Sequence, residues 1–136
     1  MAGSDIVALD ATGRPRLDGL SFAQTVAALR EDGTLVMADC GSFEDAQRAV
    51  DAGVDIVSTT LAGYTGDRVK TDGPDLELLR EVVAAFPDVP VICEGRVHTP
   101  EQAAAAMEAG AFAVIVGTAI THPTSITTWF KAAVEG

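Results

Sequence analysis

Positively charged residues are scarce in this sequence. Nine lysines and arginines stand against twenty aspartates and glutamates in 136 residues, which gives a formal net charge of −11. This balance argues against a nucleic-acid partner, because phosphate backbones are bound by clustered Lys and Arg side chains. A small phosphate ligand remains compatible with the sequence, since backbone N–H groups at the start of a helix hold such an anion locally.

Long apolar runs are also lacking. No run of about 18 apolar residues occurs, so the sequence predicts neither a transmembrane helix nor a membrane partner. The segment Met1–Asp5 has neither the basic nor the apolar region of a signal peptide. Cys40 and Cys93 are the only cysteines, and their spacing is not that of a metal or redox motif. We therefore expect reduced thiols in a cytoplasmic protein, with a disulfide between them as the less favoured alternative.

Apolar residues make up 48% of the chain and charged residues 21%, a composition that supports a packed core. The length predicts a single domain that covers residues 1–136. Within it, five short runs rich in Val or Ile are typical of strands buried on both faces of a parallel sheet. The runs are Ile6–Leu9, Thr34–Ala38, Asp55–Ser58, Val89–Cys93 and Phe112–Val116.

Helical patterns separate these runs, and two of them begin with a capping-box motif. Ser21 is followed by Gln24, and Thr99 by Gln102, a spacing that satisfies two backbone donors at each helix start. Strand and helix therefore alternate, which predicts an α/β fold with parallel strands and right-handed crossovers. The expected helices are Ser21–Glu31, Phe43–Ala52, Asp75–Phe86, Pro100–Ala109 and Ser125–Val134.

Polar or small residues follow every one of the apolar runs. Active groups of parallel α/β folds gather beyond the carboxyl ends of the strands, so we expect these residues at one rim. A single acidic strand end is commonly a helix cap, but a succession of such ends favours a functional site. The residues are Asp10, Asp39, Thr59 with Thr60, Glu94 with Arg96, and Gly117 with Thr118.

Glu94 is the best candidate for general acid–base chemistry. It directly follows the apolar residues Val91–Cys93, so its carboxyl is expected at the edge of the core, where desolvation favours the neutral acid. The alternative is a structural ion pair with Arg96, which lies two positions further on the same side of an extended segment.

Two further aspartates follow strands in the same way. Asp39 follows the apolar residues Leu35–Ala38, so it is a candidate for the same reason as Glu94. Its alternative role is to cap the helix after Gly41, although Ser42 is better placed for that. Asp10 is a candidate for substrate binding, but a structural role that braces its loop through Arg14 or Arg16 is favoured.

The last loop and one long loop are candidates for binding. Gly117 and Thr118 lie between a strand and a helix, where small residues let backbone N–H groups approach an anion. Phosphate sites in barrels often use the final two loops, which strengthens this interpretation. The loop at residues 61–74, which carries Tyr64 and Lys70, is interpreted either as a lid or as a solvated connection.

Other residues are assigned no chemistry. His98 and His122 lie far apart without a ligand partner nearby, so we predict no metal site and no cofactor. Trp129 and Phe130 in the last helix are expected to pack in the core. The sequence has no Ser-His-Asp elbow, Walker loop or dinucleotide fingerprint.

Several of these segments are also characteristic as motifs. They are A-L-D-A-T-x-R-P at Ala8–Pro15, M-A-D-C at Met37–Cys40, S-T-T-L-A-G-Y-T at Ser58–Thr65, C-E-G-R-V-H-T-P-E-Q at Cys93–Gln102 and V-G-T-A-I-T at Val116–Thr121. Together they resemble the N-acetylmannosamine-6-phosphate 2-epimerase family, in that family's order and over nearly the whole chain. The resemblance implies a TIM barrel, of which about five of the eight β/α units are present as an incomplete, C-terminal portion.

The resemblance also implies the chemistry. The family interconverts N-acetylmannosamine 6-phosphate and N-acetylglucosamine 6-phosphate in cytoplasmic amino-sugar catabolism, including sialic acid degradation, without a metal cofactor. A base removes the C2 proton, which lies α to the C1 carbonyl of the open-chain sugar, and a proton returns on the other face. The implied roles are catalysis for Glu94 and Asp39, sugar binding for Arg96, Thr60, Tyr64 and Asp10, and phosphate binding for Gly95, Gly117 and Thr118.

The chain departs from the family pattern at two points. The family carries a catalytic lysine on a strand N-terminal to this region, whereas Lys70 and Lys131 are the only lysines here and neither lies in a matching motif. His122 stands where the family usually has Arg. These departures leave two alternatives open, a non-catalytic phosphosugar-binding module and another phosphate-binding barrel enzyme.

An incomplete barrel has a further consequence. Five strands do not close an eight-stranded barrel, so both edge strands would expose apolar faces and unpaired backbone groups. We therefore expect the chain to form a homo-oligomer by edge-to-edge contact, to be unstable alone, or to be a fragment of a longer product.

Overall fold

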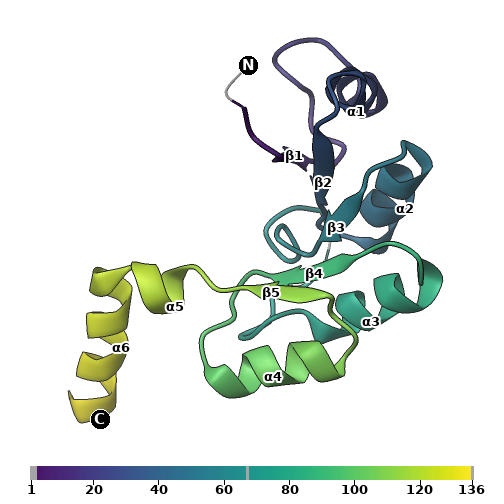
Figure 1. Cartoon of the computed structure of the whole chain (residues 1–136). Coiled ribbons are helices and arrows are strands. Elements are labelled where there is room, and N and C mark those ends of the chain that lie inside the picture. The colour runs from purple at the N-terminus through teal and green to yellow at the C-terminus, as the bar shows by residue number, and fades with distance from the viewer. Residues whose placement is uncertain (1–2, 67, 136) are drawn as a thin grey trace.

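A computed structural model describes residues 3–66 and 68–135, and residues 1, 2, 67 and 136 lie outside its description. Its centre is one parallel sheet with the strand order β1-β2-β3-β4-β5 (Figure 1). The sheet confirms the predicted α/β fold with parallel strands. The strands are β1 (Ile6–Asp10), β2 (Leu35–Asp39), β3 (Ile56–Ser58), β4 (Val91–Glu94) and β5 (Ala113–Ile115).

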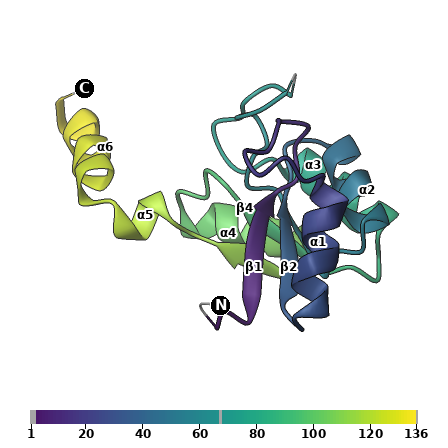
Figure 2. The same cartoon turned by 90° about the horizontal axis from the view of Figure 1, so that it is seen from above.

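Helices connect the successive strands and lie along one face of the sheet (Figures 1 and 2). Their ends coincide with the predicted ones or differ by one residue, which is within the usual scatter of helix ends. The connecting helices are α1 (Phe22–Glu31), α2 (Phe43–Asp51), α3 (Leu76–Ala85) and α4 (Pro100–Glu108).

The two predicted capping boxes form to different extents. The Ser21 hydroxyl accepts the N–H of Gln24 at 3.2 Å, and Gln24 Oε1 accepts the N–H of Ser21 at 2.8 Å, so the first box is complete. The Thr99 hydroxyl likewise accepts the N–H of Gln102 at 3.3 Å, but Gln102 Oε1 accepts the N–H of His98 at 2.7 Å instead of that of Thr99. Each cap stabilises its helix by about 1 kcal/mol.

The two faces of the sheet have different surroundings. Alternate strand residues are buried beneath the helices, where Leu78 and Leu79 of α3 are among the fully buried side chains. Because side chains alternate along a strand, Asp39 and Glu94, which end β2 and β4, lie on the opposite, half-buried face. The buried apolar strand residues are Val36, Ala38, Val57, Val91 and Cys93.

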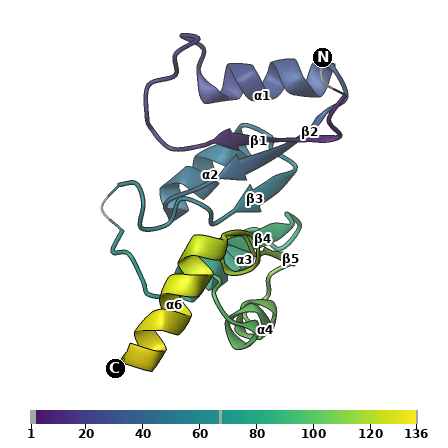
Figure 3. The same cartoon turned by 90° about the vertical axis from the view of Figure 1, so that its left-hand side faces the viewer.

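The C-terminal end differs from the sequence prediction. A short helix, α5 (Thr118–Thr121), which was not predicted, precedes α6 (Pro123–Glu135). The prediction that Trp129 and Phe130 pack in the core was wrong, because these residues are 39% and 72% exposed. Helix α6 stands away from the sheet (Figures 1 and 2), and in Figure 3, seen from its own side, it lies in front of α3 and β4. Its apolar side chains therefore have little to pack against within the described residues. The Trp129 ring does contact the His98 ring, with 4.8 Å between their centres.

The sheet is open, with β1 and β5 as its edges. Ile6 of β1 and Leu35 of β2, which are paired in register, are 47% and 46% exposed. Exposed apolar side chains and unpaired edge groups are features that proteins normally cover. None of the helices in the described part of the chain has the length and apolarity needed to cross a membrane.

Candidate active site

The carboxyl ends of β1, β2 and β3 lie side by side in register. Asp10 of β1 pairs with Asp39 of β2, and Asp39 in turn pairs with Ser58 of β3. Residues paired across parallel strands point to the same face, so the three polar side chains share one rim. Glu94 follows Ile92 by two residues in β4, and Ile92 pairs with Ser58, which places Glu94 on that face as well.

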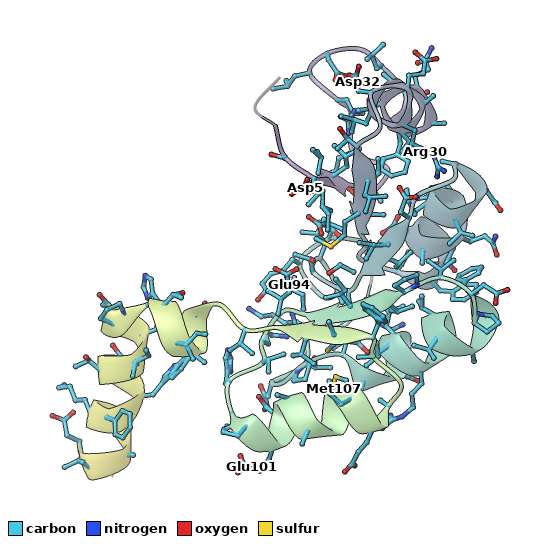
Figure 4. All side chains as sticks on the ribbon, viewed as in Figure 1. Asp5, Arg30, Asp32, Glu94, Glu101 and Met107 are labelled. Carbon is cyan, nitrogen blue, oxygen red and sulfur yellow. The ribbon has the colours of Figure 1, made fainter. Side chains whose placement is uncertain are left out.

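Thr60, two residues beyond β3, lies between the two candidate carboxyl groups. Its Oγ1 is 3.0 Å from Asp39 Oδ1 and 2.8 Å from Glu94 Oε2. Figure 4 shows Glu94 at the end of β4, next to the ends of β2 and β3. Asp39 and Glu94 therefore meet at a single hydroxyl.

Two further hydroxyls surround Glu94. Ser58 Oγ lies 2.6 Å from Thr60 Oγ1 and 3.2 Å from Glu94 Oε2, within hydrogen-bond distance of both. The Thr59 hydroxyl holds the backbone of Glu94 by donating to its carbonyl oxygen at 3.0 Å and accepting its N–H at 3.1 Å. No role was predicted for Ser58, although a serine that ends an apolar strand is itself a signal of a polar site.

The environment of Asp39 favours its neutral form. Burial raises the pKa of Asp39 above its ordinary value, the negative charges of Glu94 and Asp10 act in the same direction, and the hydrogen bond with Thr60 opposes them. The alternative role as a helix cap is not needed, because the Ser42 hydroxyl accepts the N–H of Asp45 at 3.2 Å and begins α2.

Arg96 is directed towards the loop at residues 61–74. Its guanidinium donates to the carbonyl of Gly73 at 3.1 Å, the carbonyl of Ala62 at 2.7 Å and the hydroxyl of Thr71 at 2.9 Å. Among the ion pairs of residues 3–66 and 68–135, none joins Arg96 to Glu94. The alternative of a structural ion pair between these two residues therefore does not apply.

The backbone after Glu94 explains this direction. Gly95 and Arg96 both have left-handed backbone angles, with φ of 96° and 57°. A Cβ atom at position 95 would lie 3.3 Å from the carbonyl oxygen of Thr60, which leaves room only for glycine without displacement. The turn packs closely on Thr60 and takes the Arg96 side chain away from the Glu94 carboxyl.

Hydrogen bonds hold both ends of the loop at residues 61–74, of which Asp67 lies outside the described residues. At its start the N–H of Leu61 donates to the carbonyl of Cys40 at 3.1 Å. Arg68 donates to both carboxylate oxygens of Asp75, at 2.5 and 3.0 Å, and Asp75 caps α3. Two cations lie over the Tyr64 ring, with Lys70 Nζ and Arg96 Cζ each 5.0 Å from its centre. These contacts position Tyr64 beside the rim, and the choice between a lid and a connecting loop stays open.

Asp10 is engaged locally. It accepts hydrogen bonds from the N–H and the hydroxyl of Thr12 at 2.9 and 2.6 Å, and it pairs with Arg14. Burial acts to raise the pKa of Asp10, but these hydrogen bonds and the Arg14 charge outweigh it and hold the pKa below its ordinary value. The contacts match the expected brace through Arg14, and Asp10 lines a separate hollow of about 560 Å³ together with Arg48.

A small cavity adjoins Glu94. Its volume is about 230 Å³, and it brings together seven of the residues for which the sequence predicted a site role. Asp39 adjoins this group through Thr60. The lining residues are Thr60, Tyr64, Glu94, Gly95, Arg96, Val97, His98, Ile115, Gly117 and Thr118.

The predicted phosphate loop also lines this cavity, through Gly117 and Thr118. Gly117 precedes α5, and its carbonyl accepts the N–H groups of Ile120 and Thr121, both at 3.0 Å. His122, which stands where the resembling family usually has Arg, lies with its Nδ1 2.8 Å from Ser125 Oγ at the start of α6. The roles of Gly117 and Thr118 in phosphate binding stay predictions.

Metal and thiol chemistry have little support at this rim. No group of three or more His, Cys, Asp or Glu side chains in the described part of the chain could hold a metal ion. Cys40 and Cys93 are buried, free thiols, and burial raises the pKa of each. What the rim offers is proton transfer, because it holds two carboxyl groups linked by hydroxyls next to a cavity.

The parallel sheet, the helices along one face and the polar rim define the chain as part of a TIM-type β/α barrel, with carboxyl and hydroxyl groups gathered at the carboxyl ends of its strands. The family model NanE, described as "Putative N-acetylmannosamine-6-phosphate epimerase", matches residues 1–136. The chain belongs to this family, as the motifs in the sequence predicted.

Individual relatives agree with the family match. A protein of Cutibacterium acnes named "Putative N-acetylmannosamine-6-phosphate 2-epimerase" is 59% identical over 136 residues, which cover 98% of this chain and 59% of that protein. One of the same name from Corynebacterium glutamicum (strain R) is 50% identical over 131 residues, which cover 96% of this chain and 56% of the relative. The chain thus spans less than two thirds of the length of these relatives.

A solved structure shows the same fold. The N-acetylmannosamine-6-phosphate 2-epimerase from Clostridium perfringens matches with a TM-score of 0.90 and 43% sequence identity. The match covers 95% of this chain and 56% of that one. The five strands and their helices are therefore arranged as in part of that enzyme's barrel.

Proposed function

We propose that the site acts in the C2 epimerisation of N-acetylmannosamine 6-phosphate to N-acetylglucosamine 6-phosphate. Breaking the C2–H bond of the open-chain sugar gives the proton to a base, and the electron pair spreads onto the C1 carbonyl oxygen as an enolate. A proton returned to the opposite face of C2 then forms the epimer. The observation that carries the proposal is the meeting of Asp39 and Glu94 at Thr60, beside a cavity, in a chain of this family.

The proposed roles follow the position of each residue. Glu94 is the acid–base group because it supplies the carboxyl group among the residues that line the cavity. Asp39 is the second carboxyl, whose burial favours the neutral acid. Arg96, Thr60 and Tyr64 contact the sugar, Gly95, Gly117 and Thr118 contact the phosphate, and Asp10 contributes to sugar binding from β1.

A phosphosugar-binding module without catalysis is the second candidate, and the positions of the two lysines favour it. Lys70 lies over the Tyr64 ring, and Lys131 forms an ion pair with Glu135 in α6 at 2.9 Å. Neither lysine is among the residues that line the cavity beside Glu94 in the described part of the chain. In this candidate the rim holds the sugar but does not remove its proton.

Isotope exchange separates the two candidates. We expect the chain, incubated with N-acetylmannosamine 6-phosphate in deuterated water, to place deuterium at C2, as followed by proton NMR. Glu94→Gln removes the ionisable group and is expected to lower the exchange at least about 100-fold, in line with the loss of a general acid–base group. Glu108→Gln, on the exposed side of α4, is the matched control and is expected to leave exchange unchanged.

The outcomes of this experiment distinguish the role of Glu94, the binding module and another barrel enzyme. Exchange that survives in Glu94→Gln, in a variant with an unchanged circular dichroism spectrum, would show that the role given to Glu94 is wrong. Tight binding of the sugar without any exchange in the unmodified chain would support the binding module. Faster exchange with other phosphorylated sugars would point to another barrel enzyme.

We further propose that the reaction belongs to cytoplasmic amino-sugar catabolism, including sialic acid degradation. The support is the NanE family description together with the buried, free thiols. A homo-oligomer is proposed as well, because the edges of the sheet and the apolar side of α6 are exposed. Sedimentation over a range of concentrations measures the oligomeric state directly.

A further inference from the structure

The hydroxyl of Thr60 makes more close polar contacts than it has hydrogen atoms. Its Oγ1 lies 2.6 Å from Ser58 Oγ, 2.8 Å from Glu94 Oε2 and 3.0 Å from Asp39 Oδ1. A hydroxyl donates one hydrogen bond and accepts two, whereas an ionised carboxylate only accepts. If both carboxyl groups were ionised, one contact of Thr60 with a carboxylate would have no hydrogen between its two oxygen atoms.

We propose that Asp39 and Glu94 hold one proton between them through the Thr60 hydroxyl. In this arrangement the Asp39 carboxyl donates to Thr60, and Thr60 donates to Glu94 Oε2. The Ser58 hydroxyl donates to Thr60, its nearer partner at 2.6 Å, instead of to Glu94 at 3.2 Å. Each of the three contacts then contains one hydrogen, and Thr60 uses its donor and both acceptor positions. Thr60 is thus a positioning residue that acts through the two carboxyl groups.

Two observations place the proton on the Asp39 side of the hydroxyl. Glu94 Oε2 lies 2.8 Å from Thr60 Oγ1, closer than Asp39 Oδ1 at 3.0 Å, as is expected where the hydroxyl donates to a charged acceptor. Burial raises the pKa of Asp39, and the charges of Glu94 and Asp10 add to the effect. The Asp10 charge is itself partly offset by its ion pair with Arg14.

The arrangement lets the two carboxyl groups exchange roles. The Asp39 proton passes to Thr60 Oγ1 while the Thr60 hydrogen passes to Glu94 Oε2, so one O–H bond breaks and one forms at each step and no electrons are lost or gained. Glu94 becomes the acid and Asp39 the carboxylate. Epimerisation needs one group that takes a proton and another that supplies one, and the shared proton would provide both. Only this catalytic use of the shared proton rests on the proposed function.

Carboxyl titration tests the shared proton without any sugar. The chain, labelled with ¹³C at the side-chain carboxyl groups of Asp and Glu, is titrated by NMR in three forms. These are the unmodified protein, Thr60→Val, which keeps the branched shape but has no hydroxyl, and Thr60→Ser, which keeps the hydroxyl. The quantity compared is the ratio of proton affinities of Asp39 and Glu94, because the extra desolvation by valine raises both affinities and largely cancels in their ratio.

The two possible directions of the Thr60 hydrogen bond give opposite results. With a shared proton, Thr60→Val removes the acceptor of neutral Asp39 and the donor to charged Glu94, so the affinity ratio falls about tenfold or more, and Thr60→Ser restores it. A ratio that rises or stays unchanged in Thr60→Val would overturn the proposal, because Thr60 would then donate to Asp39 or to neither. Failure of sugar exchange with the expected titration would instead contradict the proposed function alone.

Discussion

Single residues shape the rim around Glu94, and Gly95 shows this most directly. Its left-handed backbone, with φ of 96°, leads the chain away from Glu94, and a Cβ atom at this position would lie 3.3 Å from the carbonyl oxygen of Thr60, closer than ordinary packing allows. The turn therefore packs against the backbone of Thr60, the residue whose hydroxyl joins the two carboxyl groups. Its contribution is geometric, since glycine itself supplies no chemistry.

Gly95→Ala is expected to destabilise the protein more than Gly33→Ala does. Both substitutions place a Cβ on a left-handed backbone, but the Cβ at position 33 would meet no atom within 4 Å, whereas that at position 95 would lie 3.3 Å from the Thr60 carbonyl oxygen. We expect about 1–2 kcal/mol for the backbone in each, and about 1 kcal/mol or more in addition at position 95. Urea unfolding measures both values, and equal losses would contradict the close packing of Gly95 on Thr60.

Asp39→Asn is expected to stabilise the fold at neutral pH. Because the pKa of Asp39 is raised in the folded state, folding favours its protonated form, and the associated stability is fully present below the unfolded value of 3.8 and is lost as pH rises through the folded pKa. Asparagine carries no charge at any pH, so its melting temperature is expected to exceed that of the unmodified protein at pH 7 and to approach it below pH 3.8.

The control for this prediction is Asp88→Asn, which removes one charge from the exposed turn after α3. The opposite shift at Asp10, whose folded pKa is lowered, remains in every variant and cancels in the comparison. A melting temperature of Asp39→Asn that falls at neutral pH, or a difference that does not depend on pH, would contradict the burial of an unfavourable charge at position 39.

Among the helices, α3 packs against the sheet, whereas α6 stands apart from it. Leu79 of α3 is fully buried, whereas Phe130 of α6 is 72% exposed. We expect Leu79→Ala to cost about 2–5 kcal/mol of unfolding free energy, through lost burial and a remaining cavity. Phe130→Ala is expected to cost less than about 0.5 kcal/mol, as is usual for exposed positions.

Urea unfolding at low protein concentration measures both losses. If Phe130→Ala cost as much as Leu79→Ala there, helix α6 would pack on the rest of the chain in solution, contrary to its position in Figure 1. A loss at Phe130 that appeared only at high concentration would instead indicate that the apolar side of α6 is covered by a second copy.

The sequence predicted those elements whose signals are local. The strands and the connecting helices follow from the alternation of apolar runs with capped helical patterns, and the capping box at Ser21 forms as its spacing indicates. The exposure of Trp129 and Phe130 could not be predicted in this way, because an apolar helix face shows only that something should cover it. Helix α5 is too short to give a periodic signal.

The candidate site was predictable only in part, for a similar reason. Parallel strands bring their carboxyl ends together, so the meeting of Asp39 and Glu94 at one rim follows from the order of strands. The partners of Arg96 depend on a left-handed turn and on a loop at residues 61–74, neither of which has a sequence signature that fixes its path. Ser58 has its role only through distances to Thr60 and Glu94.

In the molecule as a whole, the sheet is open, but polar side chains gather at the carboxyl ends of its strands as they do in a closed β/α barrel. The edges at β1 and β5 leave apolar side chains exposed, yet the polar cluster between β2 and β4 lies in the interior of the sheet and does not depend on either edge. The rim is therefore expected to keep its geometry whether the edges are covered by another copy of the chain or by additional β/α units.

The most direct measurement is a crystal structure of this chain bound to N-acetylmannosamine 6-phosphate. We predict that the sugar occupies the cavity beside Glu94, with its C2 atom about 3–3.5 Å from a Glu94 carboxyl oxygen and its phosphate next to Gly117 and Thr118. A sugar bound in the separate hollow lined by Arg14 and Arg48, with the cavity at Glu94 empty, would contradict the assignment of the active site.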